Sequence, residues 1–261
     1  MKGRGYSVED LVYRTPLSEP EPCEDMPEYV QKSLEQRGVN YNNMEVGKTS
    51  DNNWVLIKPG KANFGRAAPA HLAYNIVDSY LDFNSPEISY DSEEDIILLE
   101  HLGDMKTPQR SEYIPKDSLI NALASKAIMG DPDISGNFGI KERKCCIYDF
   151  DQAGNTIRSV EESLKDCLKL INRSTSTDIR LKDIEKEAAS MAERPDLEKL
   201  EEELEPLKDF YPDVDDAVKF RPSYITYNIE VAREEEIFNY EEAEPKPETR
   251  TVSSEGSQIF F

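Results

Sequence analysis

The sequence holds few large apolar side chains for its charge, and this sets the first limit on what it can fold into. Leucine, isoleucine, valine and phenylalanine together number 59 of 261 residues, while the formal net charge is −22. This apolar share, about 23%, lies just above the roughly 20% below which a strongly charged chain stays disordered. We therefore expect ordered and polar regions to be separated along the chain.

The negative charge is concentrated toward the C-terminus. Residues 141–190 carry 10 basic and 10 acidic side chains, whereas residues 191–261 carry 8 and 20 and sum to −12. Self-repulsion favours an extended, solvated tail. The sequence therefore predicts a flexible arm over 1–26, an ordered region over 27–232 with a sub-boundary near 131–140, and an acidic disordered tail over 233–261.

Composition also excludes several classes of protein. No apolar run reaches the ~18 residues of a membrane span, and the N-terminus MKGRGYSVED lacks the apolar core of a signal peptide. A pI near 4.5 argues against direct binding of nucleic acid through its phosphates. The cysteines form no CxxC pair, which argues against zinc and for free thiols. The cysteines are Cys23, Cys145, Cys146 and Cys167. We expect a protein of the reducing cytoplasm with no cofactor.

Hydrophobic periodicity predicts an α+β fold that is mostly α, with a helical central domain, one or two short strands and flexible acidic termini. The apolar run 54–57, stopped by Pro59, predicts a buried strand, and the alternation over 223–232 predicts another. The Asn-rich stretch 39–53 predicts a loop. Apolar spacings of three and four, with start and stop signals, predict helices over 27–38, 69–82, 92–103, 115–129, 161–171 and 178–208.

Four leucines give the clearest amphipathic stripe. They repeat at spacings of three, four and three, as on one face of a helix. The stripe fits self-association as a coiled coil, a groove-binding helix for a partner, or a surface helix packed on its own domain. We predict a partner-binding face, with the acidic tail contacting a protein of basic surface, and the leucines are Leu197, Leu200, Leu204 and Leu207.

One short stretch carries potential chemistry. Asp149 and Asp151 stand two residues apart, and Gly154 falls at the sixth position, as in the start of a calcium loop. The twelfth position, where a bidentate glutamate is expected, is Val160. The next residue is a glutamate, so the candidate metal ligands are Asp149, Asp151 and Glu161, with calcium as the ion.

A family resemblance rests on the same stretch. Tyr148-Asp149-Phe150-Asp151, with Gly154, Arg158 and Ser163-Leu164, resembles the single EF-hand region of the naked cuticle proteins, Dishevelled-binding antagonists of Wnt signalling. The resemblance covers about 25 residues and implies protein binding by this region, with variable metal binding. Lys2 stands where the myristoylation signal of the family has glycine, and the basic, His-rich tail of the family has no counterpart.

Two further interpretations use these residues. The strand over 144–148 followed by Asp149 and Asp151 resembles the first motif of haloacid-dehalogenase-type phosphatases. That resemblance implies a nucleophile at Asp149 and a general acid at Asp151, beside magnesium, on a fold that needs further parallel strands downstream. The same residues also make a good turn without any metal.

Taken together, these patterns predict a non-enzymatic, acidic intracellular adaptor or regulator that acts through protein–protein interaction. Three alternatives remain open. One is a degenerate EF-hand regulator that binds calcium in signalling. Another is an acidic assembly or viral replication cofactor of the phosphoprotein type that binds a basic partner. The third is a magnesium-dependent phosphatase.

Overall fold

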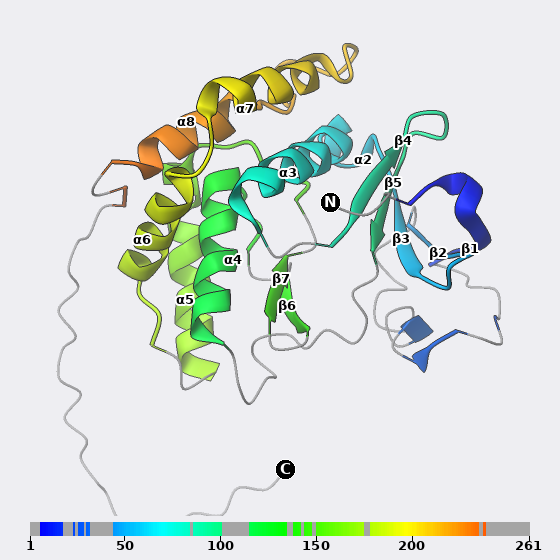
Figure 1. The fold of residues 1–261 in the computed structure, drawn as a ribbon, viewed down its shortest axis with the longest axis horizontal. Helices are drawn as coiled ribbons and strands as arrows, with labels where there is room; N and C mark the ends of the chain where they lie inside the picture. The colour runs from blue at the N-terminus through cyan, green and yellow to red at the C-terminus, as the bar shows by residue number, and fades with distance from the viewer. Residues whose placement is uncertain are drawn as a thin grey trace, which may run out of the picture.

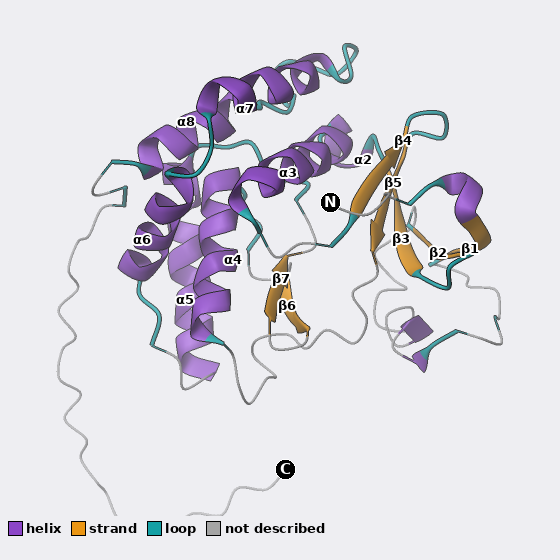
Figure 2. Cartoon of the chain, in the orientation of Figure 1, coloured by secondary structure: helices purple, strands orange, loops and turns teal. Residues whose placement is uncertain are grey.

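The structure is a computed structural model of the chain. An antiparallel sheet lies beside a group of helices (Figures 1 and 2). None of the helices it describes is long and apolar enough to cross a bilayer. The described residues are 6–17, 23, 26–28, 30–31, 44–83, 86–100, 115–134, 138–141, 144–147, 150–174, 178–234 and 237–238.

A five-stranded antiparallel sheet forms the N-terminal part of the fold. Its spatial order is β1-β2-β3-β5-β4, which makes β3 the central strand. Successive side chains of β3 point to opposite faces: Trp54 and Leu56 join the main core, whereas Val55 and Ile57 face a smaller cluster. The strands are β1 (Leu11–Pro16), β2 (Glu45–Thr49), β3 (Trp54–Pro59), β4 (Ile88–Asp91) and β5 (Ile96–Glu100).

The helices lie beside this sheet (Figure 1). The helix α3 follows β3 and packs on β4 and β5, while α4, α6 and α8 pack on one another. Figure 1 shows α7 lying along α3 at the top of the molecule. The helices are α3 (Ala67–Leu81), α4 (Lys116–Met129), α5 (Glu161–Ser174), α6 (Leu181–Ala192), α7 (Leu197–Leu204) and α8 (Ser223–Ala232). Shorter elements are the 3-10 turns η1 (Val8–Asp10), η3 (Ile157–Val160) and η4 (Glu205–Asp209), the turn α2 (Ala62–Gly65) and the hairpin β6 (Phe138–Lys141) and β7 (Lys144–Ile147).

The predicted fold class, mostly helical with one or two short strands, is wrong. The five-stranded sheet includes β2, within a stretch expected to be a loop, and β5, within one expected to be a helix. The run 96–99 is buried on both faces of the sheet, so it shows no alternation that would mark it as a strand. The four residues before it are not a helix cap but the tight connection from β4.

That connection explains why the helix prediction failed. The Asp91 carboxylate accepts the backbone N–H groups of Glu93 and Glu94, both at 2.9 Å. Asp95 then takes a left-handed conformation, with φ 54°. An Asx turn and a helix cap use the same residue types, so composition alone does not separate them.

The segment 1–26, expected to be a flexible arm, supplies the edge strand β1. Leu11 to Pro16 pair antiparallel with β2, with a register shift between Leu11 and Tyr13. Its side chains alternate regularly, but only Thr15 is buried, and Val12 on the other face is 65% exposed. A short edge strand of this kind leaves little hydrophobic signal in the sequence.

The predicted strand over 223–232 is the helix α8. Its alternating apolar residues coexist with a second pattern at positions i, i+3, i+4 and i+7, which is the spacing of one helix face. Ile225, Asn228, Ile229 and Ala232 are all fully buried on that face. Pro222 stands directly before the helix, where it is well tolerated.

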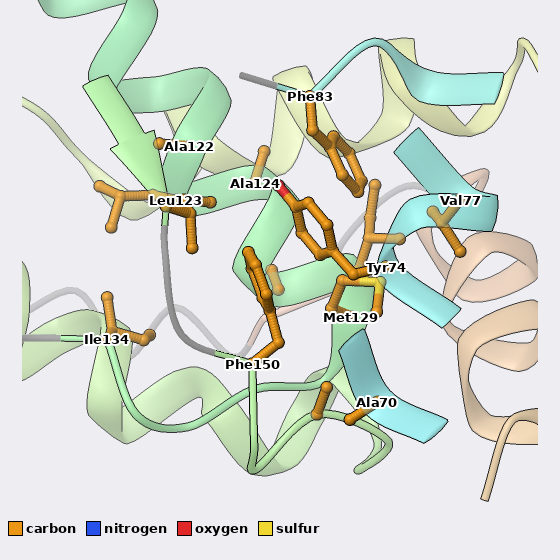
Figure 3. Close-up of a cluster of buried hydrophobic side chains, with 14 of the residues drawn as sticks. Ala70, Tyr74, Val77, Phe83, Ala122, Leu123, Ala124, Met129, Ile134 and Phe150 are labelled. Atoms are coloured by element: carbon orange, nitrogen blue, oxygen red, sulfur yellow. The ribbon is translucent and has the colours of Figure 1, made fainter. Parts of the chain in front are cut away.

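The main core joins the sheet and the helices in one continuous cluster. At its centre, Phe150 stacks on Tyr74, with ring centroids 3.5 Å apart and planes at 21°. Phe83 packs against the same Tyr74 ring, and Figure 3 shows the three rings among aliphatic side chains from α3 and α4. The strand at 54–57 and helices over 69–82, 115–129 and 161–171 are confirmed.

Candidate functional site

A buried lysine projects from the central strand toward the helices. Lys58 shares the face of Trp54 and Leu56 because all three lie two residues apart on β3. Only 8% of its side chain is exposed. A lysine is almost never this buried unless an anion pairs with it.

Asp151 is that anion. Its Oδ2 lies 2.6 Å from the Lys58 Nζ, and 18% of its side chain remains exposed. His71, fully buried on α3, places Nδ1 3.4 Å from Asp151 Oδ1 and 2.8 Å from the Ala67 carbonyl oxygen. Since a carbonyl only accepts, Nδ1 carries the proton. The pair joins the sheet to a segment 93 positions away in the sequence and keeps one partner in contact with solvent.

The segment that carries Asp151 is a turn that hydrogen-bonds to the end of α4. The Gly154 N–H donates to the Met129 carbonyl at 2.8 Å, and the Asn155 N–H donates to the Gly130 carbonyl at 3.1 Å. Gly154 has φ +87°, and a Cβ there would meet the Phe220 ring at 2.8 Å. This position therefore requires glycine.

A fully buried asparagine ties the same turn to α8. The Asn228 amide nitrogen donates to the carbonyls of Ile128 and Asn155 at 2.9 and 2.8 Å, and its oxygen accepts the Ile157 N–H at 2.6 Å. All of these are within hydrogen-bond range. The side chain thus joins three segments and holds the turn as a rigid platform.

The loop after β3, residues 60–66, donates hydrogen bonds to the turn that carries Asp151. The Asn63 amide donates to the Asp151 carbonyl at 2.7 Å, and the Arg66 guanidinium donates to the Ala153 carbonyl at 2.6 Å. Burial lowers the pKa of Arg66. Asn63 and Phe64 are both left-handed, with φ 51° and 59°. Left-handed non-glycine residues are uncommon and costly, and they cluster at functional sites.

A second lysine–aspartate pair closes the end of α4. Lys126 Nζ lies 2.8 Å from Asp131 Oδ2, and each side chain is only 1% exposed. The same Nζ donates to the Asp133 carbonyl at 3.0 Å and sits 5.0 Å from the centre of the Phe150 ring. With no solvent access, this pair is suited to holding the loop 131–134 in place.

That loop brings a second carboxylate to the Asp151 turn. The Gln152 amide donates to Asp133 Oδ2 at 3.3 Å, and the Asp133 N–H donates to Asp131 Oδ1 at 3.0 Å. Asp133 is partly exposed, unlike Asp131. Asp151 and Asp133 therefore both contact this turn, Asp151 as one of its residues beside Lys58 and Asp133 through the Gln152 side chain. A cation next to a carboxylate can hold an anion and a divalent metal together.

The predicted metal ligands do not gather in the described residues. Asp149 lies outside them. Glu161 opens α5, and its carboxylate pairs with Lys165 Nζ at 2.7 Å. Across the described ranges, no group of three or more His, Cys, Asp or Glu side chains is placed to hold a metal ion. The calcium set stays a prediction, and Val160, at the twelfth loop position, is fully buried.

The phosphatase interpretation lacks its scaffold in the structure. β7, the strand that leads into the motif, pairs antiparallel with β6 in a two-stranded sheet. Every strand pair among the described residues is antiparallel. The parallel strands that would deliver the other catalytic groups of a haloacid dehalogenase are therefore missing from this part of the chain.

The predicted partner-binding leucines lie inside the chain's own core. Leu200, Leu204 and Leu207 are nearly fully buried, and Leu197 packs against the same cluster. The stripe therefore belongs to a helix packed on its own domain, the third of the alternatives above. The start of the predicted tail is also packed: Ile237 and Phe238 are buried, and their N–H groups donate to the Glu185 carboxylate.

The described cysteines are free thiols, as expected. Burial raises the pKa of Cys167 to about 12 and also raises that of Cys145. Such thiols stay protonated and unreactive at neutral pH.

Sequence reasoning missed Lys58, although a signal was present. The run 54–58 reads Trp, Val, Leu, Ile and Lys. Because side chains alternate between the two faces of a strand, the lysine shares the face of Trp54 and Leu56. A charged residue at the inward position of a buried strand is a candidate functional group.

Comparisons with known proteins add little to this site. No family model matches the sequence, and a search of curated proteins finds no relative. Among solved structures, the crystal structure of CtkA, a proinflammatory kinase of Helicobacter pylori, is similar with a TM-score of 0.41 and 11% identity. The match covers 74% of this chain and 91% of that one. Similarity this low carries no argument about activity.

Proposed function

We propose that the protein transfers a phosphoryl group from a nucleoside triphosphate at the turn that carries Asp151. The observation that carries the proposal is the Lys58–Asp151 pair, in which a lysine of the central strand meets a partly exposed carboxylate at 2.6 Å. Protein kinases use a lysine on the third strand of an antiparallel sheet for the phosphates. They use an aspartate of a short Asp-Phe-Gly turn for magnesium. Asp151 is instead followed by Gln152 and Ala153, so the likeness lies in the lysine–aspartate pairing and not in the motif.

The residues fit a magnesium–phosphate ligand. Mg²⁺ takes hard oxygen ligands and is commonly held by one or two carboxylates together with substrate phosphates. Asp151, which pairs with Lys58 and stays partly exposed, would supply such a carboxylate. Magnesium would neutralise the charge on the transferred group.

The chain's own groups then have separate roles. Lys58, 2.6 Å from Asp151, would bind phosphate oxygens and share its charge with them. Asp133, which is partly exposed, would accept the proton of the attacking hydroxyl at its carboxylate. Lys126 and Asp131 would hold the loop that carries Asp133. This proposal runs against the sequence prediction of a non-enzymatic adaptor, which stays a prediction.

The test is phosphate transfer from γ-labelled ATP with magnesium, followed as phosphate release and as label on the protein or on casein. Lys58→Met and Asp151→Asn should each lower the rate at least about 100-fold, since they remove groups that stabilise developing charge. Lys48→Met is the matched control because Lys48 lies on the neighbouring strand, opposite Trp54. It should stay within about two-fold of the wild type.

Binding of magnesium–ATP gives a second measurement. A ligand that binds only the folded state raises its stability by RT ln(1 + [L]/Kd), so the melting temperature should rise with ATP concentration. A wild-type protein that shows neither this rise nor any phosphate transfer would contradict the proposal.

A further inference from the structure

A tyrosine far from Lys58 in the sequence contacts the loop that holds Asp151 in place. Tyr211 lies in the segment between η4 and α8, and residues 210–214 are called the strap below. The Tyr211 hydroxyl donates to the Asp95 carboxylate, to which the Tyr90 hydroxyl also donates at 2.8 Å. Burial and the hydrogen bond to Asp95 raise the pKa of Tyr211, so it stays a donor at neutral pH.

Asp95 connects the strap to the first residue of the loop 60–66. Its backbone carbonyl accepts the Gly60 N–H at 2.7 Å. Gly60 is buried, and a Cβ there would collide with the Asp95 carboxylate and the Tyr211 hydroxyl. The three residues therefore form a closely fitted junction with no room for a side chain at position 60.

The strap also contacts the rest of the loop. Lys61 Nζ lies 5.3 Å from the centre of the Tyr211 ring and 3.6 Å from Asp213 Oδ2. A Cβ on Gly65 would meet the Val214 side chain at 2.6 Å. The strap thus contacts the loop near both of its ends.

The loop needs such support because its backbone is strained. Asn63, Phe64 and Gly65 are consecutive left-handed residues, with φ 51°, 59° and 82°. Phe64 is also 76% exposed, so its side chain gains little burial in return for its conformation. Strained conformations of this kind persist only where the surroundings impose them.

We infer that Tyr211 is a positioning residue for the proposed phosphoryl-transfer site. Through Asp95 and Gly60 it fixes the loop whose Asn63 amide holds the Asp151 carbonyl at 2.7 Å. This inference rests on the proposed function for its catalytic consequence, but the effect on the loop stands without it.

The first test is hydrogen exchange, which needs no activity. Tyr211→Phe removes one hydroxyl and should speed exchange of the amides over 60–66 about ten-fold, because a hydrogen bond to a charged group is lost. Tyr80→Phe is the matched control. Its hydroxyl donates to Glu203 at 2.7 Å, between α3 and α7, and it makes no described contact with the loop. It should leave exchange over 60–66 unchanged.

The second test is a split in the kinetics. In Tyr211→Phe, kcat for phosphate transfer should fall about five- to ten-fold while KM for magnesium–ATP stays within about two-fold. Asp95→Asn, which keeps an acceptor oxygen, should fall between this variant and the wild type. Gly60→Ala should act like Tyr211→Phe, since its Cβ pushes the same groups apart.

The outcomes separate the two proposals. Unchanged loop exchange in Tyr211→Phe, or an equal change in Tyr80→Phe, overturns the positioning role whatever the activity. If loop exchange is faster in Tyr211→Phe while the wild-type protein transfers no phosphate, the proposed function is overturned and the coupling of Tyr211 to the loop stands. Melting temperatures of both variants show that each is folded at the temperature of measurement.

Discussion

Among the described residues, two buried lysine–aspartate pairs differ in what surrounds them. Lys126 and Asp131 are five residues apart at the end of α4, and each is 1% exposed. Lys58 and Asp151 come from the sheet and from a distant turn, and Asp151 is 18% exposed. The sealed pair holds one loop, whereas the partly open pair keeps its carboxylate in contact with solvent, where the proposed function places a metal ligand. Accessibility, more than burial of charge, separates a candidate site from a structural contact.

The largest expected effect is on the sealed pair. Asp131→Ala leaves Lys126 charged and buried without its partner, which should lower the free energy of unfolding by about 3–5 kcal/mol. Urea unfolding followed by circular dichroism measures this. A loss below about 1 kcal/mol would show that water reaches Lys126 and that the two pairs are alike.

Alkaline pH probes the helical region through a buried thiol. Unfolded thiols titrate near pH 9, whereas the pKa of folded Cys167 is about 12. Between these values the folded state keeps a proton that the unfolded state has lost. Stability is therefore full below pH 9 and falls as pH rises toward 12, by about 1.4 kcal/mol per pH unit for each such thiol. Urea unfolding at pH 8, 9 and 10 should show a shallower fall in Cys167→Ala than in the wild type.

The open pair should matter less for stability than the sealed one. Lys58→Met leaves Asp151 partly hydrated, so we expect a loss of about 1 kcal/mol, alongside the loss of phosphate transfer. The measurement is the same urea titration, with Lys48→Met as the control. A loss as large as that of Asp131→Ala would mean that Lys58 is mainly structural.

The smallest effect is expected when the sealed pair is replaced as a unit. Lys126→Met with Asp131→Leu removes both charges and keeps apolar volume, so stability should change by about 1 kcal/mol or less. The Asp133 N–H loses its acceptor in this variant, so we expect the change to be a loss of stability. Phosphate transfer should drop only if the loop 131–134 shifts. A collapse of the fold would assign the pair an essential role in specifying the loop.

The sequence predicted the elements that have strong, regular periodicity. The helices at 69–82 and 115–129 and the strand at 54–57 are present because their apolar side chains face one core at regular spacing. It did not predict β1, β2 and β5, whose residues are either short and half-exposed or buried on both faces. Long-range pairing stabilises these strands, and local propensity does not record it.

The candidate site was predictable only in part. Asp151 stood out because a carboxylate pair followed by glycine is a recognisable motif. Its partner Lys58 stands 93 positions earlier, and the loop residue Asn63 has no motif at all. The leucine stripe correctly predicted a helix, but the face predicted to bind a partner packs in the chain's own core. Periodicity shows that a face is apolar but not what covers it.

The five-stranded sheet has a consequence for how the protein is made on the ribosome. All of its strands lie within the first 100 residues, and its outer cluster is covered early by Tyr6, Val8 and Leu11. Most of the helices that complete the inner core come from residues 116–232. At 5–20 residues per second, the nascent chain waits roughly 10 s with that inner face incomplete. Trp54 and Leu56 are then available to chaperones, so slow translation after residue 100 should increase the demand for them.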